Sequence, residues 1–137
     1  METRERLVDG LLDLTRVARS VYGEKSGQQR VLLTLSETGT LPQGELTARL
    51  GVSRSSASEI LTKMAKSGLI ERLPDGARAR IALTDAGRLQ ARTAAERYRT
   101  ACERLFSRLS GEEEKTLLSI IERLSVAAET QTGSDIL

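Results

Sequence analysis

The chain has 137 residues and a formal net charge of +2, and this length suits a single domain. It contains no His and a single Cys, which excludes a Ser-His-Asp or Cys-His catalytic relay, the common zinc sites and a disulfide within the chain. With two Tyr, one Phe and no Trp, it is poorly suited to bind single strands by base stacking. No apolar stretch suits a signal peptide or a membrane span, so we expect a cytoplasmic protein. We also expect no cofactor.

The charges are distributed unevenly along the chain. Residues 43–92 carry nine basic and five acidic side chains, a net charge of +4, which leaves −2 for the remainder; residues 111–137 alone carry −4. A basic middle segment followed by an acidic end indicates a polyanionic partner for the middle segment only. Chance clustering on a solvated surface would give the same pattern, so charge alone does not identify that partner.

Apolar residues recur at three- and four-residue steps, which is typical of helices. The pattern predicts six of them, over residues 7–21, 28–36, 42–50, 54–66, 85–109 and 111–128. Pro42 suits the first turn of the third helix, where its missing N–H would lack a partner in any case. We expect Ser53 and Thr84 to cap the fourth and fifth helices, and Ser110 and Glu113 to form a capping box for the sixth. Residues 131–137 are polar, and we expect them to be frayed.

Between the fourth and fifth helices the pattern changes to that of one small β-hairpin. Pro74-Asp75-Gly76 is a strong turn signal. Residues 78–83 then alternate, with Ile81 and Leu83 on one face and Arg80 and Ala82 on the other. The sequence therefore predicts a mainly α fold with a single hairpin.

Residues 43–66 have the pattern of a helix-turn-helix, because Gly51-Val52-Ser53 separates two short helices. In the second of these helices, Ala57, Ile60, Leu61 and Met64 form an apolar inward face. Its first turn carries short polar or basic side chains, which would let the helix enter a major groove about 12 Å wide. Taken alone, this helix could also be an ordinary amphipathic helix with a serine-rich cap.

The hairpin follows this helix directly, as the wing of a winged helix would. Its arginines could enter a narrow minor groove, or they could simply keep a solvated hairpin soluble and protect its edge. The candidate DNA-binding residues are polar or basic side chains of the helix-turn-helix and hairpin: Gln43, Ser53, Arg54, Ser55, Ser56, Ser58, Thr62, Lys63, Arg72, Arg78 and Arg80.

Three stretches resemble the MarR family of bacterial winged helix-turn-helix transcription regulators. They are ELTARLGVS at 45–53, ILTKMAKSGLIER at 60–72 and LTDAGR at 83–88. The first is similar to the family's first helix and turn, the second to its recognition helix and the start of the wing, and the third to the beginning of its long helix. The order of elements resembles the family over nearly the whole chain.

This resemblance implies a homodimer in which the first, fifth and sixth helices pack across a two-fold axis, and a pseudo-palindromic double-stranded operator. It divides the single domain into a winged helix-turn-helix lobe (28–90), dimerisation helices (1–27 and 91–130) and a tail (131–137). It also implies a repressor that a small phenolic or lipophilic effector releases. Leu- and Ile-rich terminal helices independently favour a second copy. The candidate dimerisation residues are Leu7, Val8, Leu11, Leu12, Leu117, Leu118, Ile121 and Leu124.

The wing departs from the family pattern, in which an Asp is followed two residues later by an Arg. Asp75 occupies the Asp position, but Ala77 occupies that of the Arg, and the nearest arginine is Arg78. The segment between Arg72 and Asp75 is also shorter than usual in the family. We therefore expect a short wing with weaker or displaced minor-groove contact.

Other residues have both a functional and a structural interpretation. Cys102 could be a redox sensor, although its position on or near the apolar stripe of a helix favours inert packing. Residues 112–114 are three glutamates, which the dipole at a helix start accounts for without a metal. Tyr22 and Tyr98 could line an effector pocket or pack in a core.

The leading hypothesis is a dimeric DNA-binding transcription regulator. The alternative is a winged-helix module that binds protein, such as an anti-repressor or co-regulator that does not itself bind DNA. Exposed basic residues such as Arg54, Lys63 and Arg80 argue against that alternative. An enzyme is disfavoured because no set of acid, base and nucleophile is present.

Overall fold

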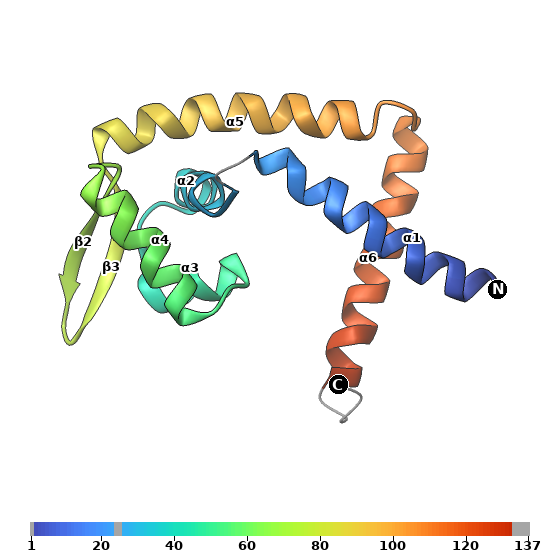
Figure 1. Ribbon diagram of the computed structural model, residues 1–137, viewed down its shortest axis with the longest axis horizontal. Helices are drawn as coiled ribbons and strands as arrows, with labels where there is room; N and C mark the ends of the chain where they lie inside the picture. Colours follow the sequence, from blue (N-terminus) through green and yellow to red (C-terminus); the bar gives the residue numbers. More distant parts are fainter. Residues whose placement is uncertain (1, 24–25, 133–137) are drawn as a thin grey trace. The chain divides into compact units, whose positions relative to one another are not determined.

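The computed structural model describes residues 2–23 and 26–132, which form helices and one small sheet (Figure 1). The chain divides into two compact units, Met1–Ala101 and Cys102–Leu137. The elements in chain order are α1 (Thr3–Arg19), the 3-10 turn η1 (Ser20–Tyr22), α2 (Ser26–Thr38), β1 (Leu41–Pro42), α3 (Gln43–Leu50), α4 (Arg54–Lys66), β2 (Ile70–Asp75), β3 (Arg78–Leu83), α5 (Asp85–Leu105) and α6 (Gly111–Thr132). Within the described ranges, every helix is too short or too polar to cross a membrane.

The predicted order of helices and hairpin is confirmed, and α4 has the predicted bounds because its cap is local chemistry. The Ser56 N–H donates to Ser53 Oγ at 3.1 Å, so the first turn of α4 is capped as expected. The capping box ahead of α6 also forms, with Ser110 N–H donating to Glu113 Oε1 at 2.9 Å and Glu113 N–H to Ser110 Oγ at 3.2 Å.

Several predicted boundaries are wrong. Pro42 lies in β1 and not in the first turn of α3, since Leu41 and Pro42 pair with Ile81 and Arg80 of β3. The helix α5 ends at Leu105 and not at 109, because the chain tightens into turns there, with N–H groups bonded three residues back. Residues 131 and 132 belong to α6 instead of a frayed tail, whereas 133–137 lie outside the described residues.

The sheet has three antiparallel strands in the order β1-β3-β2, one more than the predicted hairpin. Strands β2 and β3 pair over six residues each, from Ile70↔Leu83 to Asp75↔Arg78. They are joined by the two-residue loop Gly76-Ala77, in which Gly76 has a φ of +63°. This hairpin is the wing, and its free end extends away from the helices (Figure 1).

One apolar core holds the helix-turn-helix and the wing together. Its fully buried side chains come from α2, α3, α4 and β3: Val31, Leu32, Leu46, Leu61, Met64 and Ile81. Helix α2 supplies Val31, Leu32 and Leu35 to this core and packs against α3, α4 and β3. The core therefore fixes α4 from its inward face, as the apolar spacing of α4 predicted.

The start of α5 is packed tightly against the end of α4. Thr84 Oγ1 donates to Gly68 O at 2.6 Å and accepts from Gly87 N–H at 3.0 Å, so Thr84 caps α5 as predicted. A Cβ atom added at Gly87 would lie 1.9 Å from Leu69 O, which leaves room for glycine only. The C-terminal end of α4 is thus held by backbone packing.

Candidate nucleic-acid interface

The helix-turn-helix presents the first turn of α4 to solvent. Gly51 ends α3 in the left-handed conformation, with a φ of +65°, and two residues later Ser53 begins the capped turn. The Ser53 hydroxyl also lies 2.9 Å from that of Ser56, while Arg54 and Ser55 are exposed. The cap therefore orders this turn, and short side chains leave its backbone accessible to a phosphate or a base edge.

A surface groove of about 860 Å³ joins α3, α4 and β3 at this position. It is lined by the end of β1, the first part of α3, the first half of α4 and the start of β3: Pro42, Gln43, Gly44, Glu45, Thr47, Arg54, Ser58, Arg78 and Ala79. The groove thereby brings together four of the predicted DNA-binding residues, which are Gln43, Arg54, Ser58 and Arg78. We call it the α3–α4–β3 groove.

The electrostatics of this groove favour an anion. Within the described residues, Arg54 and Arg78 form no ion pair, so both guanidinium groups are available to a partner. Glu45 is the acidic residue of the lining, and its carboxylate is 3.5 Å from Arg49 Nη2. Two unpaired arginines, beside a glutamate that is paired with Arg49, suit contact with phosphates.

Other predicted DNA-binding residues make contacts with neighbouring residues of the same chain. Arg72 Nη2 donates to Thr62 Oγ1 at 3.3 Å, which links β2 to α4. Arg80 Nη1 lies 3.7 Å from Asp75 Oδ2, and Arg80 Nη2 donates to Thr40 O at 3.2 Å. These contacts link the wing to the segment that leads into β1. Lys63 is exposed, and its Nζ lies 3.8 Å from Glu59 Oε1.

The sequence did not identify Thr47, Gly44 and Glu45 as lining residues. A signal was available, because Thr47 lies one helical turn after Gln43 and its Oγ1 donates to Gln43 O at 2.9 Å.

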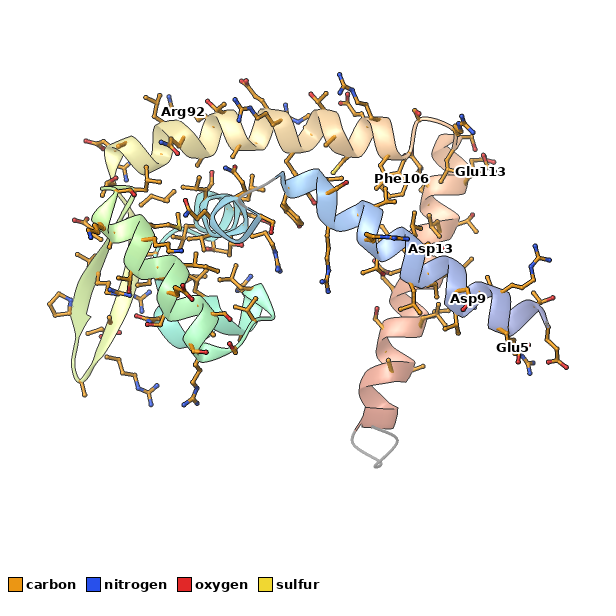
Figure 2. The ribbon with its side chains drawn as sticks, viewed as in Figure 1. Glu5, Asp9, Asp13, Arg92, Phe106 and Glu113 are labelled. Atoms are coloured by element: carbon orange, nitrogen blue, oxygen red, sulfur yellow. The ribbon has the colours of Figure 1, made fainter. Side chains whose placement is uncertain are left out.

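The candidate dimerisation residues are mostly exposed on α1 and α6. None of the side chains of α1 is buried, and Leu12 is 66% exposed. In α6, Leu118, Ile121 and Leu124 are exposed, whereas Leu117 is half-buried. Acidic residues run beside the apolar stripe of α1, where Figure 2 labels Glu5, Asp9 and Asp13 one turn apart. These stripes are apolar faces that a single chain leaves in contact with water.

A second functional candidate surrounds the two tyrosines. The rings of Tyr22 and Tyr98 are stacked, with centroids 5.1 Å apart and an interplanar angle of 15°. Two cavities of about 360 and 340 Å³ adjoin this pair. Arg30 and Arg49 line the first together with Glu37, and Arg97 lines the second. An aromatic stack with an arginine in each adjoining cavity suits an aromatic anion.

Cys102 lies in the other unit, half-buried beside an apolar hollow of about 380 Å³ that Phe106, Leu117, Leu118 and Ile121 help to line. Figure 2 labels Phe106, which follows the end of α5, and Glu113, which lies in the first turn of α6. Among the described residues, no group of three or more His, Cys, Asp or Glu side chains could hold a metal ion.

Comparison with known proteins gives the same fold and family. The model of the MarR family matches residues 26–80, which span α2 to the first part of β3. A comparison with curated protein sequences gave no match.

Solved structures match over most of the chain. The PcaV transcriptional regulator of Streptomyces coelicolor, in complex with its natural ligand, is 23% identical with a TM-score of 0.73, over 92% of this chain and 94% of that chain. A MarR transcriptional regulator from Methanosarcina mazei is 19% identical with a TM-score of 0.77, over 100% and 95%. A mutant MarR from E. coli complexed with operator DNA is 19% identical with a TM-score of 0.71, over 88% and 91%.

These matches confirm the predicted winged helix fold. Proteins of the matched family are transcription regulators and not enzymes, which agrees with the composition. Residues 26–80 thus match the MarR family of transcription regulators, and the chain has the winged helix fold of the solved structures it resembles.

Proposed function

We propose that the chain acts as a homodimeric repressor that binds a pseudo-palindromic operator and leaves it when a small aromatic acid binds. The observation that carries this proposal is the α3–α4–β3 groove, with Arg54 and Arg78 unpaired on the exposed side of the helix-turn-helix. Each lobe would place α4 in a major groove, and the two arginines would contact phosphates on the flanking backbone.

Dimerisation is supported by the exposed apolar stripes of α1 and α6. Leu12 and Leu124 are 66% and 53% exposed, and burying such residues against a second copy stabilises association by about 25 cal/mol per Å² of apolar surface, before the entropy of association is subtracted. A dimer would present two recognition helices to half-sites about one turn of DNA apart.

An aromatic acid is the effector that the tyrosine pair and its two cavities suit best. Its ring would lie against Tyr22 or Tyr98, and Arg30 or Arg97 would contact its carboxylate. This proposal rests on the chemistry of the two cavities.

A mobility-shift titration with the promoter DNA that flanks the gene tests this function. We expect a shift whose log affinity falls steeply with log salt, because phosphate contacts release counterions. Benzoate and a hydroxybenzoate should weaken the shift, whereas cyclohexanecarboxylate, which lacks the aromatic ring, should do so much less. The absence of a shift at low salt would refute operator binding, and equal effects of all three acids would refute an aromatic site.

A further inference from the structure

Arg30 of α2 holds the end of α3, the helix that precedes the recognition helix. Its Nη1 donates to Leu50 O at 2.6 Å, and its Nη2 donates to Arg49 O at 3.3 Å. The last carbonyls of a helix lack partners within that helix and form the negative end of its dipole. A guanidinium that bridges two of them is therefore a charge-assisted cap supplied by a different helix.

The same guanidinium also contacts the tyrosine pair. Arg30 Cζ lies 5.6 Å from the centroid of the Tyr22 ring, and that ring stacks on Tyr98 of α5. Contacts thus run without a break from Tyr98 through Tyr22 and Arg30 to the carbonyls of Arg49 and Leu50. All of these residues belong to the unit Met1–Ala101.

The two ends of α4 are held in different ways. The segment that directly follows its C-terminal end is held by the start of α5, since Gly68 O accepts from Thr84 Oγ1 and Gly87 packs against Leu69 O with no room for a side chain. Its N-terminal end follows α3 after the short turn at Gly51, so its position depends on where α3 ends. A small movement of α3 would therefore displace the first turn of α4, which carries Arg54, more than the last turn.

We propose that Arg30 is a positioning residue for DNA recognition, which sets the first turn of α4 by linking the end of α3 to the Tyr22–Tyr98 stack. This proposal rests on the DNA-binding function but needs neither the dimer nor the effector. It assigns no contact with DNA to Arg30, which is half-buried. Its effect on the operator is exerted through Arg49 O and Leu50 O.

The test is a double-mutant cycle read out as operator affinity, on the full chain without any effector. Arg30→Ala and Tyr22→Leu should each weaken operator binding by about tenfold, and the double variant should lose little more than either single variant, because both break the same link. Arg30→Lys, which keeps the charge but not the planar fork, should give an intermediate loss. Arg19→Ala removes one exposed arginine of α1 and is the control for charge, with an affinity close to that of the unchanged chain.

A second measurement separates positioning from stability. Thermal unfolding and circular dichroism of each variant give the folded fraction at the temperature of the binding assay, so a loss of affinity is counted only where the variant is folded. Unchanged affinity for Arg30→Ala, or losses that simply add in the double variant, would overturn the proposal while leaving DNA binding intact. Failure of the unchanged chain to bind DNA would instead refute the function on which the proposal rests.

Discussion

The two kinds of helix in this chain differ in what supports them. In the winged helix-turn-helix lobe, Leu61 and Met64 are fully buried, whereas the leucines of α1 and α6 lie mostly in water. Both sets are apolar residues at helical spacing, so the sequence pattern is the same for each. The difference shows that helical periodicity identifies a face that must be covered, without saying whether the same chain covers it.

The largest expected difference between the two regions is in the free energy of unfolding, when one glycine of each is replaced by alanine. Gly87→Ala would place a Cβ atom 1.9 Å from a backbone oxygen, so we expect a loss of at least about 3 kcal/mol in the free energy of unfolding. Gly10→Ala in α1 meets nothing within 4 Å and removes a helix-interior glycine, so it should stabilise by about 0.5–1 kcal/mol. Denaturant unfolding of both variants checks this, and equal effects would mean that α5 does not pack on the lobe as described.

The next effect concerns association. Ile121→Asp and Leu12→Asp should each give monomers by light scattering, because a charge would be buried in the proposed dimer contact. Leu89→Asp is the matched control, since Leu89 is 64% exposed on α5 but is not among the dimerisation residues, and it should leave the mass unchanged. Dimers that persist in both test variants would place the interface elsewhere on the chain.

A smaller difference is expected in operator affinity, between variants of a groove arginine and of an arginine of α1. Arg54→Ala should weaken operator binding by about tenfold and reduce the slope of log affinity against log salt by about 1.8, since each of the two chains of the proposed dimer loses one phosphate contact. Arg16→Ala, which removes an arginine paired with Asp13 on α1, should change neither quantity. Fluorescence anisotropy with labelled promoter DNA at several salt concentrations measures both, and an unchanged slope for Arg54→Ala would exclude it from phosphate contact.

The smallest effect concerns the cap of α4. Ser53→Ala removes the acceptor of the Ser56 N–H, and we expect a loss of about 1 kcal/mol in the free energy of unfolding. Ser53→Asp, which can cap the same turn, should restore most of that stability. Should thermal melts show equal losses for the two variants, the cap would contribute less than its geometry indicates.

The parts of the fold that could be predicted are those that depend on local chemistry. The bounds of α4 follow from Ser53 and the glycine after its end, and the capping box at Ser110 needs four residues only. The strand at Leu41 could not be predicted, because its partner Ile81 is far along the chain and two residues carry no alternation. The early end of α5 was missed because apolar spacing continues into the turn that follows.

The candidate site shows the same division. Residue type and position on α4 were enough to place Arg54 and Ser58 on its exposed side, and the structure adds Arg78 to the same groove. Residue type could not tell that Arg72 bonds Thr62 or that Arg80 bonds Thr40, because those partners are set by the packing of the wing. Arg30 gave no local signal, since its partners are carbonyls about twenty residues away.

The mass of the complex with promoter DNA, measured by light scattering, shows how many chains bind each operator. Two winged lobes paired through α1 and α6 predict two chains bound to each duplex at saturation, and one chain or none for the Ile121→Asp variant at the same concentration. Operator binding by a dimer would be contradicted if one chain of the unchanged protein bound each duplex and the variant had the same affinity.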